Sequence, residues 1–99
     1  MIEVKFGEYS VEAKGHAQTA PEGEDLVCAA VSTVLWALFE GLSRLEGVEV
    51  KMDAPNPGNG HVTAKNVPRE GDGMFIMAET ALSHLAFTFP GAVHIAKPA

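Results

Sequence analysis

The chain has 99 residues, of which 46% are apolar, and its 7 basic and 13 acidic side chains give a formal net charge of −6. This length fits a single domain over residues 1–99, and the apolar content is sufficient for a core without disulfide or metal cross-links. The negative charge and the scattered basic residues argue against direct binding of nucleic acid.

The sequence also lacks the usual features of exported, membrane-spanning or metal-stabilised chains. The N-terminus alternates charged and apolar residues, unlike a secretory signal, and the longest uncharged run, Leu26 to Phe39, is shorter than the ~20 residues that cross a bilayer. One cysteine excludes an internal disulfide, and no Cys/His pair has zinc-finger spacing. We therefore expect a soluble cytoplasmic protein with no membrane partner, metal or other cofactor.

The first half of the chain predicts a hairpin, a loop and a helix. Residues 2–6 and 9–14 alternate apolar and polar side chains, which is typical of two paired strands. Residues 15–25 contain a proline, two glycines and few apolar side chains, so we expect a long loop of the kind that often carries function. An apolar pattern then predicts a helix over residues 26–47, with Asp25 as its N-cap and a glycine in the left-handed conformation at its end.

The second half predicts another hairpin, a second helix and a final strand. Residues 48–52 and 61–65 alternate on either side of a turn-forming cluster rich in Pro, Gly and Asn. A helix is expected from about Gly73 to Phe89, capped by Asp72, followed by a short strand over residues 92–96. The order ββαββαβ predicts an α+β fold of two layers, a mainly antiparallel sheet with two helices on one face.

The lone cysteine is a candidate nucleophile because of its predicted position. A cysteine in an apolar helix is most often inert packing, but Cys28 is expected in the first turn, where unpaired N–H groups and the positive end of the dipole favour a thiolate. His16 stands at the start of the predicted loop that leads to Cys28, so one connection joins a possible base to a possible nucleophile. The other histidines, His61, His84 and His94, show no metal-binding motif.

Two polar neighbours bear on the same site. Asp25 lies three residues before Cys28, and Ser32 lies four residues after it on the same helical face. Their ordinary roles would be an N-cap for Asp25 and, for Ser32, a hydrogen bond back to the carbonyl of Cys28. Free backbone N–H groups at residues 26–28 are candidates for binding an oxyanion.

These residues resemble a known family signature. Gly15-His16-Ala17, followed by Gly23-x-Asp25-Leu26-Val27-Cys28-Ala29-Ala30-x-Ser32, is similar to the signature of the ribosomal-processing cysteine proteases, the Prp family, also catalogued as YsxB-like proteins. The strand start Gly60-His61-Val62, the chain length and the element order are also similar to that family.

The resemblance implies a site and an activity. It implies that His16 and Cys28 form a catalytic dyad that Asp25 and Ser32 support. It implies a homodimer that removes a short, apolar, Phe-containing N-terminal extension from a bacterial large-subunit ribosomal protein, a step in ribosome assembly. The alternative from another class is a non-catalytic module that binds a ribosomal protein or an assembly intermediate, with Cys28 merely packed.

The resemblance also implies that the loop between the two catalytic residues closes over the peptide. This substrate-gating loop would include Ala17, Gly23 and Glu24. Some family members have histidine where this chain has Glu24, a difference that alters the charge of the loop and leaves the proposed catalytic residues in place.

Overall fold

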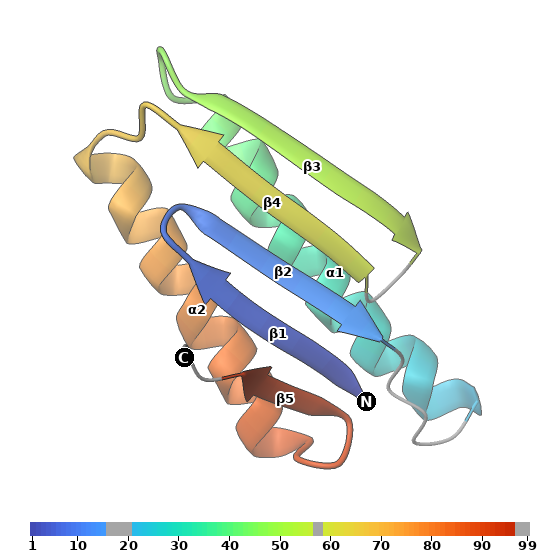
Figure 1. The fold of residues 1–99 in the computed structure, drawn as a ribbon. Helices are drawn as coiled ribbons and strands as arrows, with labels where there is room; N and C mark the ends of the chain where they lie inside the picture. The colour runs from blue at the N-terminus through green and yellow to red at the C-terminus, as the bar shows by residue number, and fades with distance from the viewer. Residues whose placement is uncertain (16–20, 57–58, 97–99) are drawn as a thin grey trace.

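The computed structural model describes residues 1–15, 21–56 and 59–96, with the backbone alone for residues 21–25 and 56. These residues form, in chain order, β1 (Ile2–Gly7), β2 (Ser10–Gly15), α1 (Pro21–Ser43), β3 (Glu49–Asn56), β4 (Asn59–Lys65), α2 (Arg69–Thr88) and β5 (Val93–Ala96) (Figure 1). The predicted order ββαββαβ is confirmed.

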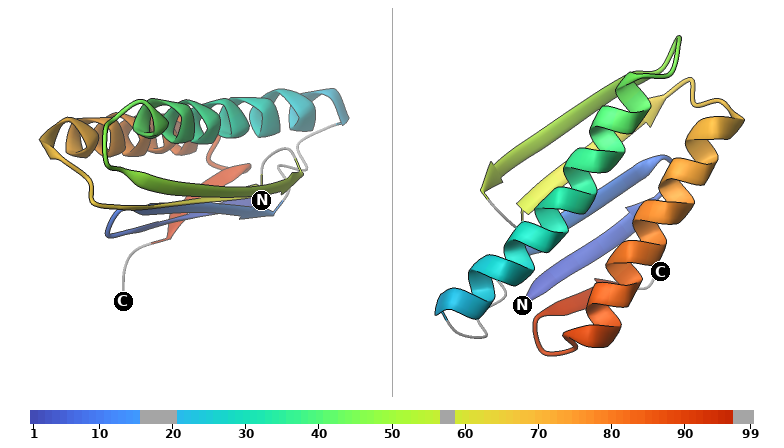
Figure 2. Two further views of the ribbon diagram at one scale, coloured as in Figure 1. Left: turned by 90° about the horizontal axis from the view of Figure 1, so that it is seen from above. Right: turned by 180° about the vertical axis from the view of Figure 1, so that it is seen from behind.

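The strands form one sheet with both helices on the same face. Within the described residues the strand order is β3-β4-β2-β1-β5. All neighbouring pairs are antiparallel except β1 and β5, which run parallel. Figure 2 shows α1 and α2 side by side in a second layer on one face of the sheet. The prediction of a two-layer α+β fold with a mainly antiparallel sheet is therefore confirmed.

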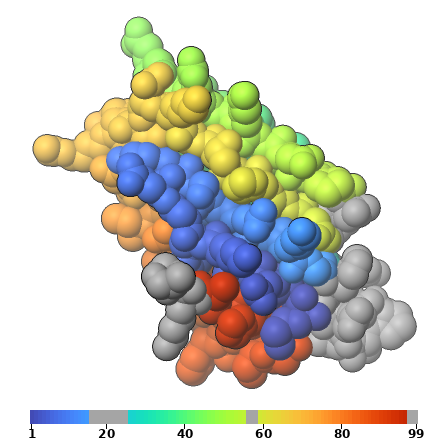
Figure 3. Space-filling model, in the orientation of Figure 1, coloured from blue at the N-terminus to red at the C-terminus, as the bar shows by residue number. Residues whose placement is uncertain are grey.

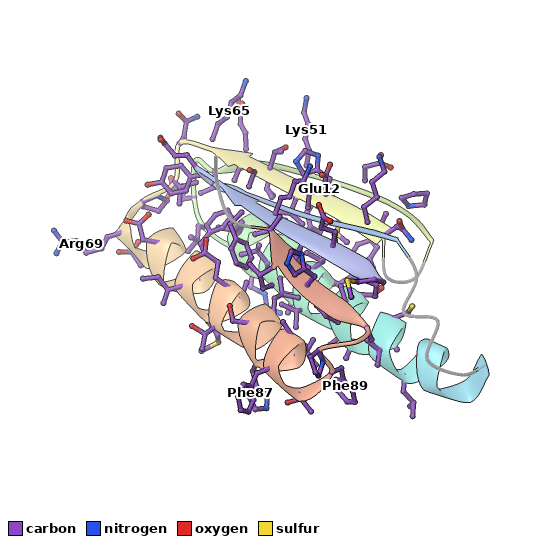
Figure 4. All side chains as sticks on the ribbon, turned by 60° about the horizontal axis from the view of Figure 1, so that its bottom comes forward. Glu12, Lys51, Lys65, Arg69, Phe87 and Phe89 are labelled. Carbon is purple, nitrogen blue, oxygen red and sulfur yellow. The ribbon has the colours of Figure 1, made fainter. Side chains whose placement is uncertain are left out.

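The core lies between the sheet and the helices. Alternate residues of the strands face the helices, as the period of two requires. The fully buried side chains that fill this layer are Ile2, Val4, Val11, Val31, Leu35, Leu42, Val62, Leu82 and Val93. The opposite face of the sheet is open to solvent (Figure 3), and Glu12, Lys51 and Lys65 project from it (Figure 4). The sheet is thus apolar on one face and polar on the other.

The first helix begins earlier than the sequence pattern predicts. The pattern predicts a start at Leu26, but α1 begins at Pro21. Proline is well accommodated at the first helical position, and the acidic residues that follow complement the helix dipole. Asp25 is therefore not the N-cap, and Gly23 and Glu24 lie in the helix rather than in a loop.

The second helix and the second hairpin also exceed their predicted lengths. α2 begins at Arg69 rather than Gly73, its N-cap is Pro68 without a side-chain hydrogen bond, and Asp72 lies in its first turn. β3 and β4 extend into the segment expected to be a turn, because beyond an irregularity after Asp53 their pairing resumes between Asn56 and Asn59.

The apolar character of α1 has two structural explanations. Residues Leu26–Ser43 have a mean hydropathy of 1.7 and would be long enough to span a membrane by length and composition alone, a property shared by many core helices of soluble proteins. Here α1 packs against β3, β4 and α2. Its buried side fills the core, and a second side lines the groove described below.

Candidate functional site

Helix α1 places Cys28 about two turns beyond the first helical residue. Only 7% of Cys28 is exposed, and it lies with Val27 and Val31 on the side of α1 that faces the core. Its position corrects one expectation. The backbone N–H groups of residues 26–28 belong to the interior of the helix, so they are not free to bind an oxyanion. The dipole argument for a thiolate also fails here, because that effect is confined to the first turn.

A groove runs along α1 from Ala29, the residue after Cys28, to Glu40. Its volume is about 620 Å³, and it is lined by Ala29, Ser32, Thr33, Trp36, Ala37, Glu40, Ala54 and Pro55. Cys28 itself faces the core and does not line the groove, but its neighbours on α1, Ala29 and Ser32, do. The other wall comes from the end of β3. The volume is within the range of small-molecule and peptide side-chain pockets.

Aromatic and acidic side chains determine the polarity of this groove. Trp36 is 45% exposed and meets Phe39 edge to face, with ring centroids 5.7 Å apart and an angle of 82° between the rings. Glu40 lies one turn beyond Trp36 on the same side of the helix. The Thr33 hydroxyl donates to the carbonyl of Ala29 at 2.8 Å. The groove therefore offers an apolar wall with a carboxylate near one end.

One of the predicted supporting residues lies one helical turn from Cys28, the candidate nucleophile. Ser32 is half-buried, lies on the same side of α1 as Cys28 and lines the groove. The backbone of Asp25 lies in α1 one turn before Cys28, while its side chain is outside the described residues. His16 and Ala17 also lie outside the described residues.

The end of β2, immediately before His16, is held by a residue that the sequence analysis missed. The Gly15 N–H donates to Oδ1 of Asn59 at 2.9 Å, and Nδ2 of Asn59 donates to the carbonyl of Gly15, also at 2.9 Å. Gly15 has a φ of 122°, and a Cβ atom there would overlap the carbonyl oxygen of Met1. The sequence pattern places Asn59 in a turn, and no local pattern indicates its pairing with Gly15, 44 residues away.

A second close contact joins β4 to α1. A Cβ atom at Gly60 would come within 2.8 Å of Cδ1 of Leu35, which is itself fully buried. A larger residue at this position would force the buried Leu35 side chain to move, so glycine suits the close approach of β4 to the helix. The end of β2, the start of β4, the end of β3 and the N-terminal half of α1 gather at one corner of the molecule (Figure 1).

Of the three histidines that the structure describes, His61 lies at this corner, next to Gly60, and the other two lie elsewhere. His61 and His94 are exposed and alternate with buried valines, which places them on the open face of the sheet. Nδ1 of His61 lies 4.0 Å from the Glu12 carboxylate. His84 is exposed on α2, with Nε2 3.4 Å from the Thr88 hydroxyl. Within the described parts of the chain, no three His, Cys, Asp or Glu residues gather as a metal site.

Solved structures similar to this one include peptide complexes of a protease. The ribosomal processing protease Prp from S. aureus, in complex with a covalently linked product peptide, has a TM-score of 0.76 at 18% identity, over 95% of this chain and 94% of that chain. The same protease with a substrate peptide has a TM-score of 0.75 at 16% identity, over 96% and 95%. The protein SMU.848 from Streptococcus mutans has a TM-score of 0.77 at 28% identity, over 96% and 91%. These likenesses establish a shared fold.

The family assignment rests on the sequence. No curated protein sequence matches the chain. A model of the family described as cysteine protease Prp, however, matches residues 1–94, which include the nucleophile candidate Cys28 and every strand and helix up to the start of β5. The chain therefore belongs to the Prp family of cysteine proteases.

Proposed function

We propose that this protein is a cysteine endopeptidase that removes a short N-terminal extension from a bacterial large-subunit ribosomal protein. The observation that carries the proposal is the family match over residues 1–94 in a chain whose one cysteine lies on the helix that forms one wall of a groove. The S. aureus structures with substrate and product peptides support a peptide as the ligand of this fold.

Cys28 is the nucleophile of the proposed reaction, and His16 is its base. His16 directly follows Gly15, whose position at the corner near α1 is fixed by Asn59. The other histidines face the open side of the sheet or the outside of α2, which leaves His16 as the candidate. Ser32 at the groove and Asp25 one turn before Cys28 support the pair.

The chemistry proceeds in two steps. The sulfur of Cys28 attacks the scissile carbonyl carbon as its proton passes to His16. The C–N bond then breaks, the proton moves from His16 to the leaving amine, and an acyl-enzyme remains on the sulfur. Water, activated by the same histidine, hydrolyses the thioester and regenerates the free thiol.

The groove along α1 is the proposed binding site for the substrate segment next to the scissile bond. Its apolar wall at Trp36 suits an apolar or aromatic side chain, consistent with a Phe-containing extension. Glu40 suits a basic group further along the peptide. A net charge of −6 favours approach of a basic ribosomal protein by long-range attraction.

We further propose that the enzyme acts as a cytoplasmic homodimer. Support for a second copy comes from the outer side of α2, where Ile76, Met77 and Phe87 are 63%, 74% and 84% exposed. Exposed apolar side chains grouped in this way are typical of protein interfaces. Phe87 projects from the helix layer on the side away from the sheet (Figure 4).

One observation favours the alternative of a non-catalytic binding module. Cys28 is only 7% exposed and belongs to the core cluster, as a merely packed thiol would. Alkylation separates the two functions. A protease requires Cys28 to react with iodoacetamide in the folded protein, whereas a packed thiol reacts only after denaturation.

The decisive experiment is mass spectrometry of the ribosomal protein from the same genome after incubation with the purified chain. We expect the wild type to shorten its N-terminus and Cys28→Ala, which changes a small side chain, to leave it intact while remaining folded. Cleavage by Cys28→Ala would remove Cys28 from the mechanism. Absence of cleavage by both proteins, with the thiol reduced, would contradict the proposed substrate.

A further inference from the structure

The side chain of Asn59 extends the ladder between β2 and β4 where the backbone pairing stops. These strands pair Val11 with Val62 and Ala13 with Gly60. The next position of β2 in this alternation is Gly15, and its N–H and carbonyl are both bonded by the side-chain amide of Asn59, at 2.9 Å each. A carboxamide with one donor and one acceptor thus completes the pair of bonds that two backbones exchange in an antiparallel sheet.

Gly15 is constrained from its other side as well. It pairs with Ile2 of β1, and its φ of 122° brings it so close to Met1 that no side chain fits. Both backbone polar groups of Gly15 are therefore bonded to one side chain, and its conformation is open to glycine alone. Among the described residues this is the last one before His16.

We propose that Asn59 is a positioning residue for the catalytic base: by bonding both backbone groups of Gly15, it anchors the residue that directly precedes His16 in the chain. The inference rests on the proposed function, in which His16 serves Cys28. It follows from the sensitivity of proton transfer to geometry, since a misplacement of about 1 Å can cost about a hundredfold in rate. Asn59 itself touches neither substrate nor the reacting atoms.

The first test compares steady-state kinetics of three variants with the wild type, using the extension peptide as substrate. Asn59→Ala removes both bonds to Gly15 and is expected to lower kcat by about 10- to 100-fold, with KM unchanged within about twofold. Asn59→Asp keeps the acceptor for the Gly15 N–H but lacks the donor, so its kcat should lie between the values of Asn59→Ala and the wild type. Thr63→Ala, a polar-to-alanine change elsewhere on β4, is the matched control and should match the wild type.

Two results in this test would overturn the proposal. One is an Asn59→Ala variant with the kcat of the wild type. The other is an equal loss of kcat in Asn59→Ala and Asn59→Asp, with circular dichroism showing that both variants are unfolded to the same extent. Asn59 would then be a purely structural residue.

The second test needs no substrate and separates this inference from the proposed function. The rate of alkylation of Cys28 by iodoacetamide is measured against pH for the wild type, His16→Ala and Asn59→Ala. We expect the Asn59→Ala profile to move from that of the wild type toward that of His16→Ala. A wild-type profile for Asn59→Ala, with a changed one for His16→Ala, would overturn the positioning role.

The remaining outcomes are also decisive. If His16→Ala has the wild-type profile, both the dyad and the role of Asn59 are wrong. If the profiles shift as expected but the ribosomal protein is not cleaved, the proposed substrate is wrong and the positioning role of Asn59 stands.

Discussion

Replacing Gly15 by alanine tests the most constrained backbone position of the site. A φ of 122° lies where an L-residue other than glycine is strained, at a cost of about 1–3 kcal/mol. The new Cβ would also overlap the carbonyl oxygen of Met1, which is backbone and can yield only by disturbing the pairing of β1 with β2. We therefore expect Gly15→Ala to lower the free energy of unfolding by at least about 2 kcal/mol and Tm by about 8–16 °C.

The assay is urea denaturation at fixed protein concentration, followed by the fluorescence of Trp36, the sole tryptophan. Gly73→Ala is the matched control. Gly73 is exposed in α2, has ordinary helical φ, and nothing lies within 4 Å of the place that a Cβ atom would take. Alanine there should stabilise the protein by about 0.5–1 kcal/mol. If Gly15→Ala were as stable as the wild type, the reasoning about the end of β2 would be refuted.

Two further predictions concern surfaces away from the groove. A hydrogen bond from Tyr9 to Asp72, together with the charge of Asp72, raises the pKa of Tyr9 above 10.0. The contribution of this pair to the stability of the folded protein is complete below pH 10 and is lost as the pH rises through the folded-state pKa of Tyr9. Asp72→Asn should therefore make Tyr9 ionise at lower pH in an ultraviolet titration. Superimposable titration curves of the variant and the wild type would contradict this. On α2, Met77→Lys should weaken the proposed homodimer in sedimentation equilibrium, with Ser83→Lys as the control, and a monomeric wild type would contradict the proposed dimer.

The spacing of apolar residues and the positions of glycine and proline in the sequence were enough to predict which helices and strands form and in what order. The alternation in residues 2–6 and 9–14 corresponds to the observed hairpin, and the apolar spacing of Phe75, Ala78 and Leu82 to the buried side of α2. Element boundaries were harder, because Pro21 and Gly23 look like helix breakers although a first turn accommodates proline well. The predicted start of α1 was therefore wrong. The prediction that Cys28 lies in the first turn of the helix, where a thiolate would be favoured, was wrong for the same reason.

The candidate site could be predicted only where local sequence carries it. Cys28 and Ser32 are one helical turn apart, so their common location follows from spacing alone. The bonds between Gly15 and Asn59 join residues 44 positions apart, and no local pattern indicates such a pairing. The groove between α1 and the end of β3 likewise depends on how the helix lies across the sheet.

Asn59 and Gly60, at the start of β4, contact both the helix that carries Cys28 and the residue before His16, the two members of the proposed dyad. Gly60 lets β4 approach Leu35, and Leu35 lies two turns from Cys28 on the same rigid helix. Asn59 bonds Gly15, the residue before His16. The helix that carries Cys28, the proposed nucleophile, and the residue before His16, the proposed base, therefore both contact the start of β4. A substitution at either residue should consequently alter the geometry between Cys28 and His16 before it abolishes the fold.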